Sequence, residues 1–124
     1  IQNYHKNGLT LVLASSASMG TINKVFTRFE LDQYFVAKLS GADLKASKPH
    51  PEIFIKAAQA AKHPPEHCMV IEDSTNGLKA AIGANVFCVG YDSLNSKNQD
   101  YSIADLKIND FKAIHFEKIK DILN

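Results

Sequence analysis

Glu72 and Asp73 are adjacent carboxylates that directly follow an apolar run of this 124-residue sequence. Two neighbouring anions repel each other unless something neutralises them. A hard cation with oxygen ligands, such as magnesium, is the natural partner for such a pair. The alternative is a solvated helix start, in which Asp73 or Ser74 serves as the N-cap. Position in the sequence alone leaves both interpretations open.

Lys48 lies between Ser47 and Pro49, in a rigid segment just ahead of an expected helix. A lysine fixed in such a place could neutralise a phosphate or a developing oxyanion as a point charge. The alternative is a loop lysine that faces solvent.

Ser15 and Ser16 stand where an expected strand turns into an expected helix. A hydroxyl group beside the free backbone N–H groups of a helix start makes a corner that binds anions. The alternative is a plain helix cap, made by Ser15, Ser16 or Ser18. A serine nucleophile is disfavoured, because residues 14–17 lack the flanking glycines of the GxSxG elbow.

The histidines and cysteines offer weaker candidates. The five histidines show no metal-ligand spacing, and only His50 lies near Lys48, where we expect a structural or substrate-edge role for it. Cys68 and Cys88 each sit in an apolar run, without a CxxC motif or a Cys/His cluster. This pattern predicts buried, reduced thiols and a cytoplasmic location.

The composition is that of one ordinary globular domain, with 45% hydrophobic and 22% charged residues. A net charge of +1 and the lack of a basic stripe argue against a nucleic-acid partner. The longest apolar stretch, residues 9–14, is interrupted by Thr10 and is too short to cross a bilayer, so no membrane partner is expected.

These residues must be positioned by the short apolar runs and amphipathic segments that alternate along the chain. Strands are expected at 9–14, 34–39, 68–71, 86–89 and 106–108, helices at 18–30, 51–61, 76–84 (broken near Gly83) and 116–123, and a polar loop at 90–99. Four phenylalanines are expected in the core: Phe26, Phe29, Phe54 and Phe87. The alternation predicts a parallel sheet covered on both faces, with functional groups at the carboxyl ends of its strands.

Taken together, three segments resemble one family. Residues 13–18 resemble the second motif of the haloacid-dehalogenase-like hydrolases, residues 47–54 the third and residues 70–77 the fourth. Their order, spacing and strand context agree over nearly the whole chain, and the similarity is greatest to the sugar-phosphate phosphatase and β-phosphoglucomutase branch. The resemblance implies an α/β fold, a three-layer Rossmann-like parallel sheet.

The resemblance also implies a role for each candidate residue. Ser15 would hydrogen-bond the transferring phosphoryl group, helped by the backbone N–H of Ser16, and Lys48 would hold that group and the nucleophile together. Asp73 would ligate Mg²⁺, with Glu72 beside it, directly or through water. The substrate would be a small phosphorylated metabolite. Such a set of groups suits phosphoryl transfer, which depends on positioning and charge neutralisation.

The sequence departs from the family at its first motif, an Asp-x-Asp pair whose first aspartate attacks phosphorus to form an aspartyl-phosphate. No Asp-x-Asp occurs in the sequence, and the family's cap domain is absent. We therefore expect residues 1–124 to be the C-terminal part of a single core domain, incomplete and missing its N-terminal central strand. Residues 1–8 resemble the helix that returns from the cap.

In the family the missing strand lies between the two that end here at Ser15 and Asp73. Without it, both inner strands would expose unpaired backbone groups. We expect the gap to be filled by the missing N-terminal segment or by a second copy of the chain.

The leading hypothesis is a fragment, inactive alone, of an enzyme that hydrolyses a small phosphate monoester such as a sugar phosphate. A β-phosphoglucomutase-type isomerase is an alternative, disfavoured because Ala17, Ser18 and Met19 would grip a second phosphate poorly. A dehalogenase is disfavoured because an acidic pair suits a metal-dependent phosphate site. A truncated, non-catalytic module that binds magnesium and anions is a further alternative. A receiver-like signalling domain would need an aspartate at the end of a strand ahead of the serine, and none is present.

Overall fold

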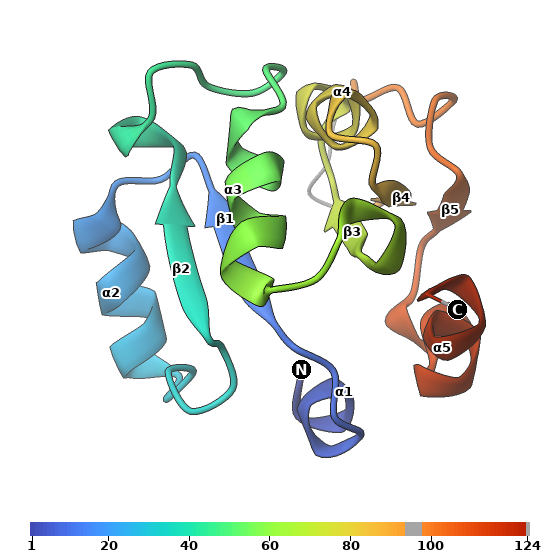
Figure 1. The fold of residues 1–124 in the computed structure, drawn as a ribbon, viewed down its shortest axis with the longest axis horizontal. Coiled ribbons are helices and arrows are strands. Elements are labelled where there is room, and N and C mark those ends of the chain that lie inside the picture. Colours follow the sequence, from blue (N-terminus) through green and yellow to red (C-terminus); the bar gives the residue numbers. More distant parts are fainter. Residues whose placement is uncertain (94–97, 124) are drawn as a thin grey trace.

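The computed structural model describes residues 1–93 and 98–123. The elements follow in the order α1 (Gln2–Lys6), β1 (Val12–Ser15), α2 (Met19–Arg28), β2 (Ala37–Ser40), α3 (Glu52–Ala61), β3 (Met69–Glu72), α4 (Thr75–Gly83), β4 (Phe87–Tyr91), β5 (Leu106–Ile108) and α5 (Phe116–Leu123). Strands and helices alternate over most of the chain, as the pattern predicts (Figure 1). The expected polar loop at 90–99 lies partly outside the described residues, and its first two residues belong to β4.

Every paired strand is parallel to its neighbour, but the strands form two separate sheets. One sheet consists of β1 and β2, and the other has the order β3-β4-β5 (Figure 1). Within the described residues no strand joins β1 to β3, which is where the sequence predicts a missing central strand. The chain is therefore an α/β protein with an incomplete Rossmann-like parallel core.

Both faces of the second sheet are buried, because successive residues of a strand point to opposite sides. Val70 and Cys88 face the core under α3 and α4, whereas Ile71 and Val89 face the core under α5. The first core contains Ile53, Phe54, Leu78, Ala80, Ala81, Ala84, Val86 and Cys88, and the second contains Val89, Ile108, Ile114 and Ile119. These two cores hold the strands whose ends carry the candidate residues.

Helix α4 begins almost immediately after β3, so the geometry of its first turn determines where the residues after the strand lie. Ser74 is its N-cap, and the Ser74 hydroxyl accepts a hydrogen bond from the backbone N–H of Gly77 at 3.0 Å. The helix ends at Gly83, where a break was expected, and Ala84 is its C-cap residue. A Cβ at Gly83 would lie only 3.1 Å from the Pro51 side chain, so the glycine serves the close approach of the segment that leads into α3.

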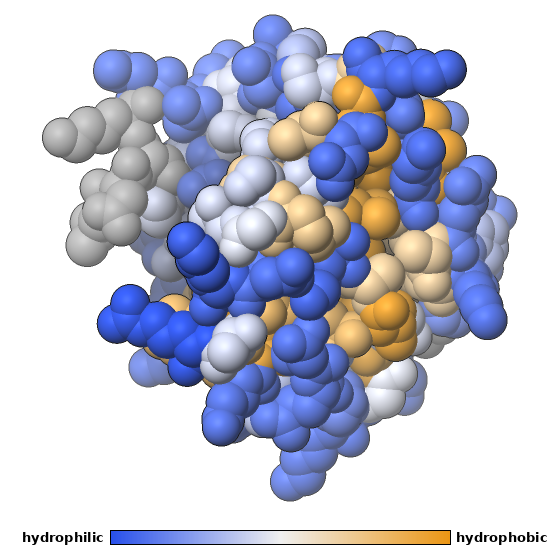
Figure 2. Space-filling view, turned by 90° about the vertical axis from the view of Figure 1, so that its left-hand side faces the viewer, coloured by the Kyte–Doolittle hydropathy of each residue, from blue (hydrophilic) through white to orange (hydrophobic). Residues whose placement is uncertain are grey.

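The expectation that Phe29 belongs to the core is wrong, since its side chain is 60% exposed. Phe26, one turn earlier, is buried, but α2 ends at Arg28 and Phe29 is its C-cap residue. The Arg28 guanidinium lies 5.3 Å from the centre of the Phe29 ring. Phe29 is therefore one of the large apolar residues that the fold leaves exposed. The side of the molecule that carries α2 and β2 shows apolar patches among hydrophilic side chains (Figure 2).

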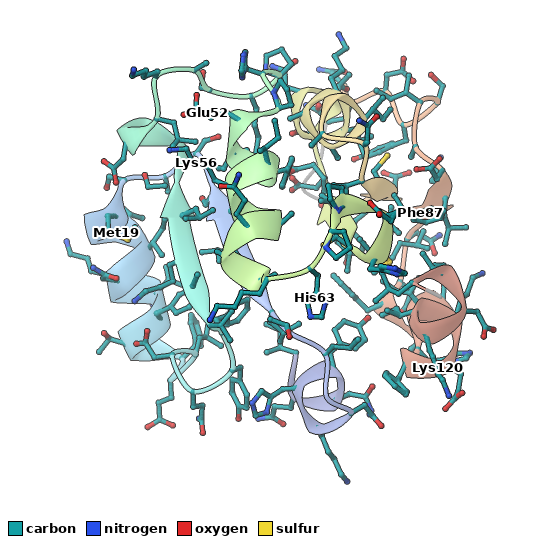
Figure 3. The ribbon with its side chains drawn as sticks, viewed as in Figure 1. Met19, Glu52, Lys56, His63, Phe87 and Lys120 are labelled. Atoms are coloured by element: carbon teal, nitrogen blue, oxygen red, sulfur yellow. The ribbon has the colours of Figure 1, made fainter. Side chains whose placement is uncertain are left out.

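The other aromatic and sulfur predictions hold in large part. Phe54 is buried, and Phe87 at the start of β4 packs, partly buried, against the second core (Figure 3). Cys88 is buried and Cys68 half-buried, and both are free thiols. No helix among residues 1–93 and 98–123 is long and apolar enough to cross a membrane.

Candidate active site

The candidate residues gather at the carboxyl ends of β1 and β3, on either side of the gap between the sheets. They line one cleft of about 480 Å³. Its walls are formed by Leu13, Ala14, Ser15, Ser16, Lys48, Ile71, Glu72, Asp73, Ser74, Tyr91 and Phe111. Clefts of similar size lie elsewhere on the molecule, so the charged and hydroxyl groups distinguish this one, not its volume.

Lys48 reaches across the gap, and its side chain is only 11% exposed. Its Nζ donates a hydrogen bond to Glu72 Oε2 at 2.8 Å and makes a longer contact of 3.5 Å with the carbonyl oxygen of Ala14. It also lies 5.1 Å from the centre of the Phe54 ring. The alternative of a loop lysine that faces solvent is therefore wrong.

Glu72 is fixed by Lys48, by Ser74 and by the first turn of α4, which the sequence did not indicate. Its second oxygen, Oε1, accepts a hydrogen bond from the Ser74 hydroxyl at 3.1 Å. A Cβ at Gly77 would lie 2.0 Å from Glu72 Cδ, so the carboxylate packs directly against the first turn of α4. The repulsion expected between the two acidic neighbours is thus relieved on one side by a lysine, because Lys48 neutralises Glu72.

Asp73 differs from its neighbour in being exposed. In the described part of the chain its carboxylate makes no ion pair, and Ser74 rather than Asp73 caps α4. The Tyr101 hydroxyl donates a hydrogen bond to the Asp73 carbonyl at 3.0 Å, which ties the backbone of this residue to the segment ahead of β5. Asp73 therefore has a fixed backbone and a carboxylate available to a ligand.

Ser15 forms a tight turn at the end of β1. Its Oγ accepts a hydrogen bond from the backbone N–H of Ala17 at 3.1 Å, which leaves its own hydroxyl proton available to a ligand. The N-cap of α2 is Ser18, whose hydroxyl accepts from the backbone N–H of Thr21. Ser15 and Ser16 are therefore not the cap of this helix, and they lie in the cleft instead.

The oxygen donors at this edge suit a hard cation in kind but are few. Across residues 1–93 and 98–123, no group of three or more His, Cys, Asp or Glu side chains is placed to hold a metal. Mg²⁺ usually keeps several waters and uses one or two carboxylates together with substrate phosphate oxygens. Asp73 fits the place of a direct ligand, while Glu72 is already committed to Lys48 and Ser74.

His50 does not line the cleft. Its Nδ1 accepts a hydrogen bond from the backbone N–H of Glu52 at 3.2 Å, so it supports the start of α3. His63 lies beyond the other end of that helix (Figure 3).

The cleft also contains an aromatic pair that sequence reasoning missed, Tyr91 and Phe111, whose ring centres lie 4.7 Å apart. Only the position of Tyr91 near the end of a strand could have indicated it.

Comparison with known proteins places this chain in a family. The sequence model of the haloacid dehalogenase-like hydrolases matches residues 1–85. Hexitol phosphatase B of Escherichia coli K12 is 30% identical over 119 residues, which cover 95% of this chain and 52% of that protein. The chain therefore belongs to the haloacid dehalogenase-like hydrolases, and it spans about half the length of this curated relative.

The solved structures agree with this assignment. A β-phosphoglucomutase from Clostridium difficile superposes with a TM-score of 0.79 at 30% identity, over 99% of this chain and 52% of that one. CbbY of Rhodobacter sphaeroides, solved in complex with phosphate, superposes with a TM-score of 0.87 at 24% identity, over 96% and 55%. The phosphoglucomutase-like branch of the family, inferred from the motifs, is thus supported by sequence and fold together.

Proposed function

We propose that this chain is the C-terminal part of a magnesium-dependent phosphatase that hydrolyses a small phosphate monoester, such as a sugar phosphate. The observation that carries the proposal is the position of Lys48, largely buried and directed into the gap between the sheets by Glu72. A cation fixed beside free hydroxyl and N–H groups is what a phosphoryl group requires. Membership of a family that contains hexitol phosphatase B supports the substrate class.

Three residues of the cleft would then bind the phosphoryl group. The Ser15 hydroxyl donates to a phosphoryl oxygen, and the backbone N–H of Ser16 donates to the same group. Lys48 neutralises the charge that the phosphoryl group carries and holds it against the nucleophile. These interactions act by positioning and electrostatics, and they need no covalent step from this chain.

Asp73 is the proposed ligand of Mg²⁺, and Glu72 contributes beside it by holding Lys48 or through a bridging water. When bound, the ion would neutralise charge on the phosphoryl oxygens. The exposure of the Asp73 carboxylate and the fixed backbone of the residue support this division of roles.

The nucleophile would come from a strand that occupies the gap between β1 and β3. Both facing edges lack a strand partner within the described residues, and two unpaired edges of parallel strands favour the addition of one more. We propose that the missing N-terminal segment supplies this strand, since the chain spans about half of its relatives. A second copy of the chain is the alternative occupant.

The proposal is tested by comparing the longer protein with residues 1–124 alone in hydrolysis of p-nitrophenyl phosphate with Mg²⁺. The longer protein should turn over the substrate and lose activity with a chelator, whereas the shorter chain should be inactive. Turnover by residues 1–124 alone would overturn the requirement for an outside nucleophile. Sedimentation of residues 1–124 distinguishes the two possible occupants of the gap. A dimer that unfolds when it dissociates would favour the second copy of the chain.

A mutase of the β-phosphoglucomutase type is the second candidate, supported by the similarity to the Clostridium difficile structure. Against it, the Ser18 hydroxyl is already engaged as the cap of α2, where it is bonded to the N–H and the hydroxyl of Thr21. Isomerisation of β-glucose 1-phosphate faster than its hydrolysis would decide for the mutase. A longer protein that binds Mg²⁺ and phosphate without turnover would decide for a non-catalytic module.

The domain assignment and the location are proposals of the same kind. Residues 1–124 would form the C-terminal part of one core domain, with a cap domain elsewhere in the longer protein. A cytoplasmic location remains the prediction from the reduced cysteines.

A further inference from the structure

Ser40, the last residue of β2, is a buried hydroxyl that the proposed chemistry does not use. It is 3% exposed and is the one polar or charged residue that is buried among residues 1–93 and 98–123. It lies opposite Ser15 in the register of β1 and β2. A polar group buried in such a place has to be paired, so its partners indicate what it is for.

The Ser40 hydroxyl is bonded on both sides. It donates a hydrogen bond of 2.6 Å to the carbonyl oxygen of Ala17 and accepts one from the backbone N–H of Ala42 at 3.2 Å. The N–H of the same Ala17 is bonded to Ser15 Oγ. Ala17 is therefore held from both ends, by Ser15 through its N–H and by Ser40 through its carbonyl.

The residue after Ser40 brings the end of β2 against the same turn. A Cβ placed on Gly41 would lie 3.4 Å from Ser16 Cα and 3.5 Å from the carbonyl oxygen of Ser15, so the backbone of Gly41 passes close beside this turn. The end of β2 therefore lies beside the turn at 15–17 and is joined to it by the hydrogen bond from Ser40.

We propose that Ser40 is a positioning residue for the phosphoryl site, acting through Ala17 to fix the Ser15 hydroxyl and the Ser16 N–H. This inference rests on the proposed function of the Ser15–Ser16 corner. Donors stabilise a phosphoryl group best when they are already oriented before it arrives, because no reorganisation is then needed. Ser40 supplies that orientation from inside the fold without touching the ligand.

The test uses the longer protein and the affinity for inorganic phosphate at saturating Mg²⁺, measured by calorimetry. Ser40→Ala should weaken phosphate binding about three- to tenfold, the range expected for one lost hydrogen bond. Ser40→Thr keeps the hydroxyl and should bind within about twofold of the parent. If the alanine variant does not fold, Ser40→Cys keeps the shape and donates only weakly.

Ser18→Ala is the matched control, because it also deletes a hydroxyl that accepts a backbone N–H, at the start of α2, but leaves the contact of Ser40 with Ala17 intact. Its phosphate affinity should not change. Loss of affinity in Ser40→Ala with rescue in Ser40→Thr supports the inference, whereas equal losses in Ser40→Ala and Ser18→Ala overturn it.

Ser15→Ala separates the two levels of the proposal. If Ser15→Ala weakens phosphate binding and Ser40→Ala does not, only the positioning role of Ser40 is wrong. If Ser15→Ala leaves phosphate binding unchanged, the phosphoryl corner itself is wrong, and the role of Ser40 is overturned with it.

Discussion

Lys48, in the segment ahead of α3, and Glu72, at the end of β3, form an ion pair of 2.8 Å beside the gap between the two sheets. Each side chain is 11% exposed, so the pair is mostly shielded from solvent. Glu72 is fixed in turn by Ser74 and by the first turn of α4. The two acidic neighbours therefore have different roles. The Glu72 carboxylate orients the lysine, and the Asp73 carboxylate is open to a ligand.

Glu72→Gln should destabilise the protein by about 1–3 kcal/mol, because it leaves Lys48 poorly solvated beside a neutral partner. Turnover in the longer protein should fall about 10- to 100-fold, since the lysine is no longer held in place. Urea denaturation and p-nitrophenyl phosphate kinetics measure the two effects.

Lys48→Met combined with Glu72→Gln completes a double-mutant cycle for this pair. A clearly non-additive change in the free energy of unfolding is expected, because the two side chains are in contact. Additive effects would mean that the pair contributes nothing to stability.

Gly77→Ala should disturb the site through Glu72. The ideal position of the new Cβ lies 2.0 Å from Glu72 Cδ, so the two groups would overlap. The Glu72 carboxylate therefore has to move away from Lys48. Gly20→Ala in α2 is the matched control, because its Cβ meets only Ser18 Oγ at 4.0 Å and a helical alanine is favoured over glycine by about 0.5–1 kcal/mol. Thermal unfolding should show a lower midpoint for the first variant and an equal or higher one for the second.

Asp73→Asn should weaken the response to Mg²⁺ in the longer protein at least about tenfold, since it removes the charge of the proposed ligand. The measurement is the Mg²⁺ dependence of both thermal stability and turnover. Asp121→Asn on α5, far along the chain from the cleft and exposed, should leave both titrations unchanged. Identical Mg²⁺ titrations for Asp73→Asn and the parent would remove this residue from the metal site.

Leu78→Ala should cost about 2–5 kcal/mol, because Leu78 is 0% exposed and lies in the core between α4 and β4. Ile82→Ala on the same helix should cost less than about 1 kcal/mol, since Ile82 is 43% exposed. Guanidinium unfolding of both variants checks the difference, and similar costs would contradict the packing described for α4.

The two thiols should react slowly with Ellman's reagent in the folded protein. Burial raises the pKa of the Cys88 thiol, and burial together with the charge of Glu66 raises the pKa of the Cys68 thiol. With a raised pKa, both thiols stay largely protonated near pH 8 in the folded state. Because only the thiolate reacts, labelling is slow until denaturant exposes the two groups, and it then goes to completion. Fast labelling of Cys88 before unfolding would contradict its burial.

The sequence by itself determined which residue types carry the chemistry and in which elements they stand. The apolar runs at 68–71 and 106–108 and the amphipathic run at 116–123 correspond closely to β3, β5 and α5, because local patterning reflects which faces are buried. The first two strands begin later than the pattern predicts. Leu9 packs against the second core, and the Leu11 carbonyl accepts a hydrogen bond from the Val36 N–H. The apolar run at 9–14 is therefore partly buried ahead of β1, although its first residues are not part of the strand.

Only the tertiary structure decided which groups meet. Lys48 and Glu72 are far apart in the sequence, as are Ser40 and Ala17, and no local pattern specifies such contacts. Phe29 lies outside the core because α2 ends just before it. Glu72 is paired with Lys48 because the fold brings the end of β3 next to the segment ahead of α3. The parallel strands bring distant residues to one edge, because their carboxyl ends all point the same way.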